Sequence, residues 1–458
     1  MSIYLKKFEN HTQYEQYING SGAILPNVSI CTTEGDVHYN PEIPHDYSQD
    51  YFTMVITSGG NIKWSGSTAF NTLSYSKNNG DNWTTANSAT TISVAEGDKV
   101  LWKGTPTPQR NKGVGKFTGD TNARYSVEGN AMSLLYGDNF NGQTSLSGKD
   151  FALYGLFSGN TNVTNTENLS LHATTLASYC YNSMFQECTS LTTAPELSAT
   201  TLADFCYGNM FFGCTSLTIA PSVLPATTLA NGCYQHMLHG CTSLTTAPEL
   251  SATTLANYCY YGMFKGCTSL TTAPELPATT LAIFCYENMF QGCTSLTTAP
   301  ELPATTLERE CYRGMFSGCT SLTTVPSVLP ATNLSGAYNC YRDMFYGCTS
   351  LATAPTLPAT TLAYYCYMSM FRECSSLTTA PELPATTLVI QCYEDMFFSC
   401  TSLNSIKCLA TDISAIDSTS GWVSNVASSG TFTKPESMTS WTTGNNGIPN
   451  GWTVVDAA

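Results

Sequence analysis

Residues 259–284 read CYYGMFKGCTSLTTAPELPATTLAIF, and this 26-residue unit recurs through the second half of the chain. Nine cysteines, each followed by tyrosine, mark the units at steps of 26, 27 or 29 residues: Cys180, Cys206, Cys233, Cys259, Cys285, Cys311, Cys340, Cys366 and Cys392. A fixed period of about 20–29 residues is typical of a solenoid of the leucine-rich type. The repeat therefore predicts a stack of about nine coils.

Each unit divides into two parts. Apolar side chains recur first at steps of four residues, as in Leu176, Cys180, Met184 and Cys188. This spacing predicts the buried stripe of a short helix. Residues 190–194 then predict a strand of about three residues that pairs in parallel with its neighbours and ends at Pro195, because proline cannot donate to a ladder.

The 20 cysteines are expected to be structural. Eighteen of them form pairs separated by eight residues, and only Cys31 and Cys408 lie outside. On a helix such a pair would be about 12 Å apart, which is too far for a disulfide, and no C-x-x-C spacing suggests metal ligands. We therefore expect free thiols in a dry core, whose candidates are Cys180, Met184, Cys188, Leu191, Cys259, Met263, Cys267 and Leu270.

The unit resembles the BspA-type leucine-rich repeats, in which a Phe-x-Gly-Cys-Ser-Ser-Leu-Thr string precedes a strand and a proline. The matching strings include FKGCTSL at residues 264–270 and FQGCTSL at residues 290–296. The resemblance covers about residues 170–405, although this unit is longer and carries the Cys-Tyr pair. It implies adhesion and the binding of a protein or glycan rather than catalysis.

The opening of the chain carries a second resemblance. A helix over residues 2–18 and a hairpin over residues 24–39 are predicted there. The string KKFENHTQYEQYINGSGAILPNVSICTTEGDVHYNP resembles the N-terminal segments of virion fibre and tail proteins from phages of Bacteroides-type gut bacteria. This resemblance implies attachment to other virion proteins.

The sequence predicts a mainly β protein with short helices. Its expected parts are an N-terminal attachment segment (1–50), an Ig-like β-sandwich (51–124), an N-terminal solenoid cap (125–170), the leucine-rich-repeat solenoid (171–403) and a C-terminal cap (404–458). Residues 76–83 resemble the Asp-box of sialidase propellers, with Asn78 where aspartate is usual, and predict a hairpin staple.

No catalytic residue, metal site or cofactor is predicted. The nucleotide-binding, zinc-protease and serine-hydrolase motifs are all absent from the sequence. His236 and His239 have a helical spacing but lack a third ligand. Acids at one coil position could attract calcium or form a solvated stripe, and the second is the favoured interpretation: Glu196, Glu249, Glu275, Glu301 and Glu382.

Charge and hydropathy narrow the possible partners. The 18 basic and 33 acidic residues give a net charge of −15, which disfavours nucleic-acid binding. No apolar run is long enough to cross a bilayer, and no secretory signal is visible at the start, so we expect folding in the cytosol, where thiols stay reduced.

The residues just before each Cys-Tyr pair vary between coils, and they suggest either a binding rim or unconstrained surface positions. The candidate receptor-binding residues are Tyr179, Phe205, Tyr258, Phe284, Arg309 and Tyr365. The favoured function is a structural or adhesive phage virion protein, a head or tail fibre assembled in the host cytoplasm. It would bind a host glycan or protein through the solenoid and could form a dimer or trimer. The alternative is a bacterial cell-surface adhesin, and an enzyme is a distant third.

Overall fold

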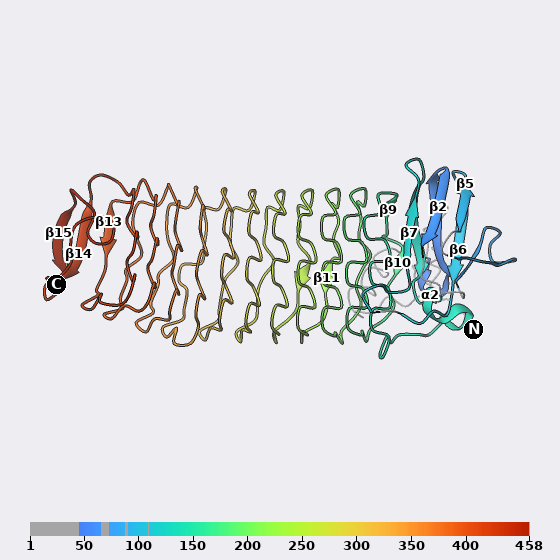
Figure 1. The fold of residues 1–458 in the computed structure, drawn as a ribbon, viewed down its shortest axis with the longest axis horizontal. Helices are drawn as coiled ribbons and strands as arrows, with labels where there is room; N and C mark the ends of the chain where they lie inside the picture. The colour runs from blue at the N-terminus through green and yellow to red at the C-terminus, as the bar shows by residue number, and fades with distance from the viewer. Residues whose placement is uncertain (1–44, 66–72, 88–89, 109, 458) are drawn as a thin grey trace, which may run out of the picture. The chain divides into compact units, whose positions relative to one another are not determined.

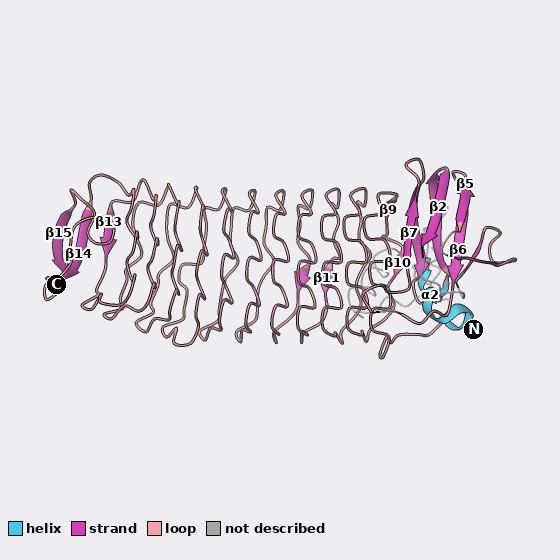
Figure 2. Ribbon diagram, in the orientation of Figure 1, coloured by secondary structure: helices cyan, strands magenta, loops and turns pink. Residues whose placement is uncertain are grey.

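The computed structural model describes residues 45–65, 73–87, 90–108 and 110–457 (Figures 1 and 2). The helix and hairpin predicted before residue 40 lie outside these residues. Residues 48–458 form one compact unit. The described part of the chain is mainly β, and its helical elements are the short helix α2 (Ser133–Tyr136) and two 3-10 turns, η1 (Tyr47–Gln49) and η2 (Gly137–Asn139). None of the described helices is long and apolar enough to span a bilayer.

The N-terminal β region contains two sheets. The larger has the order β10-β8-β1-β6-β3-β4, with β9 also paired to β8, and the smaller has the order β5-β2-β7. The strands are β1 (Phe52–Ser58), β2 (Gly60–Ser65), β3 (Ser74–Ser76), β4 (Thr84–Thr85), β5 (Thr91–Val94), β6 (Lys99–Lys103), β7 (Lys116–Gly119), β8 (Arg124–Asn130), β9 (Val163–Asn165) and β10 (Leu169–Ser170).

The two sheets share one aromatic core. Phe117 of β7 lies with its ring centroid 4.7 Å from that of Trp64 in β2 and 4.8 Å from that of Trp102 in β6. Strand β8 runs through residue 125, where a boundary was predicted, and pairs in parallel with β9 and β10. The β region therefore continues directly into the first coil of the solenoid.

The hairpin between β3 and β4 has the predicted staple. The Asn78 side-chain oxygen accepts hydrogen bonds from the Ser76 hydroxyl at 2.8 Å and from the Asn82 backbone N–H at 3.1 Å. These bonds close the loop, as the resemblance to an Asp-box implies.

The prediction of a short helix in each coil is wrong. Residues 178–187 form consecutive turns, because every fourth residue has a positive φ: Tyr179 (57°), Ser183 (56°) and Glu187 (58°). Alternate N–H groups bond back three residues, as Asn182 does to the Tyr179 carbonyl, and the others donate to the next coil, as Tyr181 does to the Cys206 carbonyl at 2.9 Å. A helix would use all these donors internally, whereas here every second N–H group joins its coil to the next.

The predicted parallel pairing is present, but it involves fewer residues in each coil than the three expected. After the turns, single-residue bridges join successive coils at one position, as in Thr272 with Thr298. A second ladder that the sequence did not reveal joins the Ala-Thr-Thr segments, as in Thr254 with Thr280. Two-residue strands within the repeat are β11 (Val223–Leu224) and β12 (Glu249–Leu250), which pair with each other.

The core of the solenoid consists of stacked identical side chains. Tyr286 and Tyr312 stack with their ring centroids 5.8 Å apart, and Phe290 and Phe316 stack at 5.6 Å. The eight predicted core residues are all completely buried. The 19 described cysteines are buried and free. The second thiol of each coil donates to a backbone carbonyl of the coil before it, to Leu238 from Cys267 and to a phenylalanine from the others, as Cys293 does to Phe264 at 3.1 Å.

One further coil lies at each end of the Cys-Tyr repeats. Residues 151–159 donate N–H groups to the coil of Cys180, as Phe157 does to the Met184 carbonyl at 2.8 Å. At the other end, the coil of Cys392 donates to residues 416–424. Trp422 is fully buried there and stacks on Trp441 at 5.5 Å. Strands β13 (Ser405–Lys407), β14 (Thr431–Pro435) and β15 (Thr453–Ala457) form the final parallel sheet.

Candidate functional site

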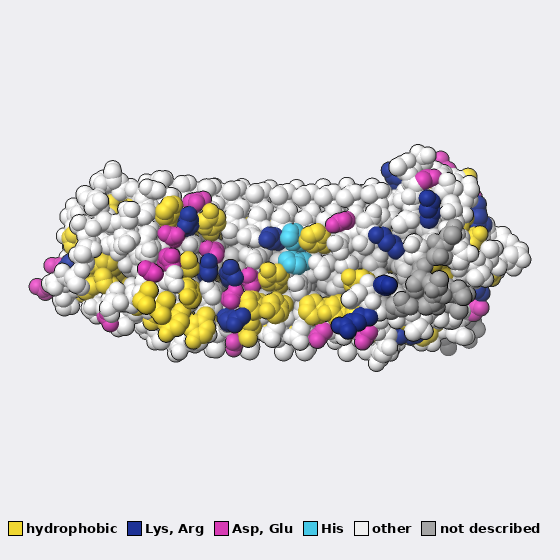
Figure 3. Space-filling model, viewed as in Figure 1, with side chains coloured by type: hydrophobic (Ala, Val, Ile, Leu, Met, Phe, Trp, Pro, Cys, Tyr) yellow, Lys and Arg dark blue, Asp and Glu magenta, His cyan; other side chains and the backbone are white. Residues whose placement is uncertain are grey.

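The outward positions of the turn segments form one continuous surface, which we call the turn face. In each coil the Cys, Tyr, Met, Phe and second Cys side chains point into the core and are buried, with Leu238 in place of the phenylalanine in one coil. The turn face comprises the six positions between or just before them, which in one coil are Asn257, Tyr258, Tyr261, Gly262, Lys265 and Gly266. Figure 3 shows hydrophobic, charged and histidine side chains gathered there, next to bands of neutral polar residues.

Aromatic rings form three stacks along the turn face. The first runs Phe151, Tyr179, Phe205, with centroids 4.8 and 5.0 Å apart. It ends where the next coil has Gly232. In the second stack the ring centroids of Tyr258 and Phe284 lie 4.6 Å apart, and the Arg309 guanidinium lies over the Phe284 ring, 4.9 Å from its centroid. The third pairs Tyr338 with Tyr364 at 5.5 Å.

Five of the six predicted rim residues therefore lie in stacks. Tyr365 does not, because the third stack uses the position one residue earlier. The predicted rim omitted Tyr338 and Tyr364, which each lie two residues before the first cysteine of their coil. The predicted helical rim is a row of turns. Its aromatic side chains therefore stack on those of the neighbouring coils and do not lie along the face of a helix.

The aromatic residues that directly precede a Cys-Tyr pair have a strained backbone. Tyr179, Phe205, Tyr258, Phe284 and Tyr365 all have φ between 55° and 60°. A left-handed conformation costs a residue with a Cβ about 1–2 kcal/mol. The other four coils place Gly232, Glu310, Asn339 and Gln391 at this position, and of these the glycine and the asparagine adopt it more easily. Aromatic side chains are thus present where the fold itself favours glycine, and strain of this kind concentrates at functional sites.

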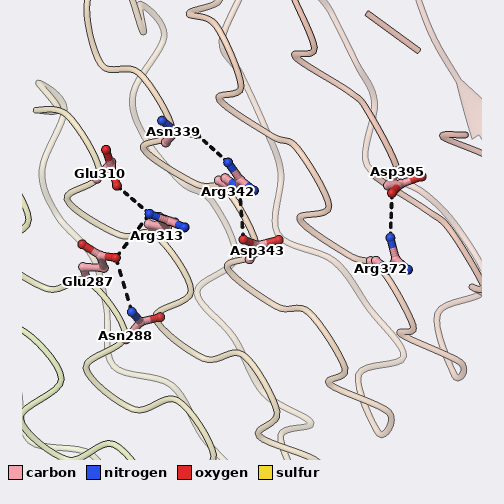
Figure 4. A network of polar contacts seen from close by, with 9 residues as sticks. All are labelled: Glu287, Asn288, Glu310, Arg313, Asn339, Arg342, Asp343, Arg372 and Asp395. Atoms are coloured by element: carbon pink, nitrogen blue, oxygen red, sulfur yellow. Dashed lines mark hydrogen bonds and ion pairs between the residues drawn. The ribbon is translucent and has the colours of Figure 1, made fainter. Parts of the chain in front are cut away.

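A network of ion pairs lies beside the stacks (Figure 4). Arg313 contacts Glu310 at 2.8 Å and Glu287 at 3.5 Å. Farther along the solenoid, Arg342 contacts Asp343 at 3.2 Å, and Arg372 contacts Asp395 at 2.6 Å. Glu287 and Arg313 come from successive coils, as do Arg372 and Asp395, so these two pairs form only when the coils stack. The other two pairs each lie within one coil.

Glu287 is the most buried carboxylate of this network, with its side chain 6% exposed. Burial raises its pKa from 4.5 to about 7, against the opposing effect of the Arg313 charge. A carboxyl whose pKa is raised by folding stabilises the fold fully below its unfolded pKa, and this contribution is lost as the pH rises through the folded value.

We therefore expect Glu287→Gln to stabilise the protein by about 1–2 kcal/mol at pH 8 and to have little effect at pH 4.5. Arg313 keeps Glu310 as its partner in this variant. Denaturant unfolding at the two pH values measures the difference, and an equal effect at both would contradict the raised pKa.

His236 and His239 form a half-buried pair on the turn face. Their Nδ1 atoms lie 3.2 Å apart, so one ring must donate to the other. Burial lowers both pKa values, that of His239 to about 4, with the neighbouring His236 and Lys265 charges contributing. The pair is neutral near pH 7 and rests against Phe212 and Tyr261.

The acidic ladder lies on exposed surface. Glu196 accepts from the Ser222 N–H and hydroxyl, and Glu382 pairs with Lys407 at 2.9 Å. Among the described residues, no three His, Cys, Asp or Glu side chains converge in a way that could hold a metal ion.

No protein-family model matches the sequence, and no curated protein matches it. The candidate site is therefore defined by its geometry: stacked rings and ion pairs displayed on a uniform, fully buried core.

Proposed function

We propose that this protein is a non-enzymatic binding and display protein, a structural or adhesive component of a virion such as a head or tail fibre. In this proposal the turn face of the solenoid contacts a glycan or protein on the host surface. The N-terminal segment attaches the chain to other virion proteins, and the chain assembles as a dimer or trimer.

The observation that carries the proposal is the strained aromatic residues of the turn face. Unconstrained surface positions would be expected to favour the residues that fit a positive φ most easily. Instead, tyrosine and phenylalanine occupy this position in five coils. Such rings offer large contact area with little loss of side-chain freedom, and aromatic and arginine side chains dominate binding energies at interfaces.

A bacterial cell-surface adhesin is the second candidate, favoured by the resemblance of the repeat to BspA-type proteins. The two are distinguished by location. Detection of the chain in purified phage particles supports a virion protein, and detection on the surface of uninfected bacteria supports an adhesin.

We expect replacement of Tyr258 and Phe284 by glycine to weaken binding to cells of Bacteroides-type gut bacteria by about tenfold or more. Gly232 shows that the backbone accepts glycine at this position, and the loss of one stack is offset by relief of strain. The free energy of unfolding should therefore change by only about 1 kcal/mol.

Binding of the labelled full chain to whole cells, measured by flow cytometry, tests this. Thr279→Ala and Thr305→Ala serve as matched controls, because both side chains are exposed and lie outside the turn face. Unchanged binding by the glycine variant, on cells that bind the parent chain, would remove the turn face from the proposal.

A further inference from the structure

A concavity of about 390 Å³ lies where the β region meets the first two coils. It is lined by the end of β2, the loop before β7 and the turns of residues 151–159 and 178–188, including Ser65, Lys112, Lys116, Tyr154, Ser158 and Gln186. This volume lies within the range of small-ligand sites, about 300–1,000 Å³.

The walls of this concavity are fixed to one another by backbone contacts. The Phe117 N–H donates to the Leu156 carbonyl at 2.8 Å, and the Asn160 side chain donates back to the Phe117 carbonyl at 2.8 Å. Gly113 packs so closely on the coil that a Cβ there would lie 2.6 Å from the Tyr154 carbonyl oxygen. The loop and the coil therefore form one rigid wall.

The space is open because the coil provides glycine there. Gly155 occupies a left-handed turn position, φ 60°, and a Cβ built on it would meet only the Ser158 Cβ within 4 Å, at 3.8 Å. In later coils the equivalent space is filled by the side chain at the same position of the coil before. A Cβ built on Gly262 would lie 2.5 Å from His236, and one built on Gly314 would lie 2.3 Å from Asn288. No coil precedes residues 151–159, so the space stays free.

The lining is basic in an acidic protein. Residues 99–127 contain six of the 18 Lys and Arg residues and a single acid, Asp120. No acidic residue lines the concavity. In the described part of the chain neither Lys112 nor Lys116 makes an ion pair. The adjacent Glu187 packs toward Gly213 in the following coil.

We propose that this concavity binds a carboxylated sugar. The two ammonium groups provide charge-assisted hydrogen bonds for a carboxylate. Ser65, Ser158 and Gln186 offer neutral donors and acceptors of the kind that sugar hydroxyls need. The site shares no residue with the aromatic stacks from Tyr179 onward, and the inference does not depend on the function proposed for them.

The test is titration of the full chain with glucuronic acid or N-acetylneuraminic acid, followed by ligand-observed NMR. We expect either acid to bind at least tenfold more tightly than glucose. The double variant Lys112→Gln/Lys116→Gln should lower that affinity at least tenfold, since both charges lie on the lining.

Gly155→Asn should also abolish binding, because it fills the space with a residue that the equivalent turn position accepts at Asn209 and Asn288. Gly240→Asn is the matched control: it has the same backbone conformation but lies outside the concavity.

Glucose binding as tightly as the acids, or acid binding that survives both variants, would overturn the proposal. So would inorganic phosphate competing as strongly as the sugar acids, because the site would then select only charge. Cell binding by the Tyr258 and Phe284 variant tests the turn face separately, so failure of one proposal leaves the other distinguishable.

Discussion

Raising the pH from about 8 to about 10 is expected to unfold the solenoid in a cooperative transition, because folding raises the pKa of its buried thiols and phenols. Burial raises the pKa of Cys206, Cys259 and Cys311 from 9.0 to about 12. It raises the pKa of the stacked tyrosines as well, as in Tyr286 and Tyr312.

The sign of the effect follows from proton binding. Between the unfolded and the folded pKa, the folded chain holds protons that the unfolded chain has released, so stability falls as the pH rises. Below the unfolded pKa the contribution is fully present. In this window the contribution of each thiol to the free energy of unfolding falls by about 1.4 kcal/mol per pH unit. With 19 such cysteines in the described chain, one unit amounts to roughly 25 kcal/mol, more than the 5–15 kcal/mol that typically stabilises a fold.

Circular dichroism and tyrosinate absorbance, followed together during a pH titration, measure this transition. We expect the two signals to change at the same pH, because the stacked tyrosines can ionise only after unfolding. Added salt at about 1 M screens surface repulsion over about 3 Å and serves as the control for net charge. Tyrosinate appearing at its ordinary pKa while the structure persists would contradict a dry core.

Most of the fold could be predicted from the repeat period. Cys-Tyr and Met-Phe pairs at constant spacing predict which side chains stack, because only a stack can bury them, and the structure places them in the core. The spacing of four residues could not separate a helix from a row of turns, since both bring every fourth side chain to one side. A distinguishing signal was present in only two of the nine coils, where Gly232 and Asn339 precede the Cys-Tyr pair and indicate a positive φ.

The candidate site was predictable only in part. Variation between coils identified the aromatic positions, since these differ while the core does not. The ion pairs between coils remained hidden because Glu287 and Arg313 belong to different coils, as do Arg372 and Asp395, and meet only after stacking. The concavity depends on contacts between the loop before β7 and residues 151–159, and neither segment carries the repeat that guided the alignment of coils.

Phe316→Ala in a central coil is expected to lower the free energy of unfolding by about 3–5 kcal/mol. Phe316 is completely buried between Phe290 at 5.6 Å and Phe345 at 5.7 Å, so the truncation leaves a cavity bounded by rings on both sides. Thr305→Ala is the matched control, because this side chain is exposed and its loss should change stability by less than about 0.5 kcal/mol.

The position of the cavity also determines how the chain unfolds. In a solenoid each coil contacts only its neighbours, so stability is approximately the sum of coil terms and interface terms. Phe316→Ala weakens two central interfaces at once and should divide the denaturant transition into two steps, with the coils on one side unfolding first. Phe397 lies next to the final coil, with its ring centroid 6.2 Å from that of Trp422. Phe397→Ala should instead unfold only the C-terminal end before the main transition. Hydrogen exchange would locate the early loss of protection in each variant. Identical exchange patterns for the two variants would mean that the solenoid unfolds as one unit and that stacking couples the coils beyond their nearest neighbours.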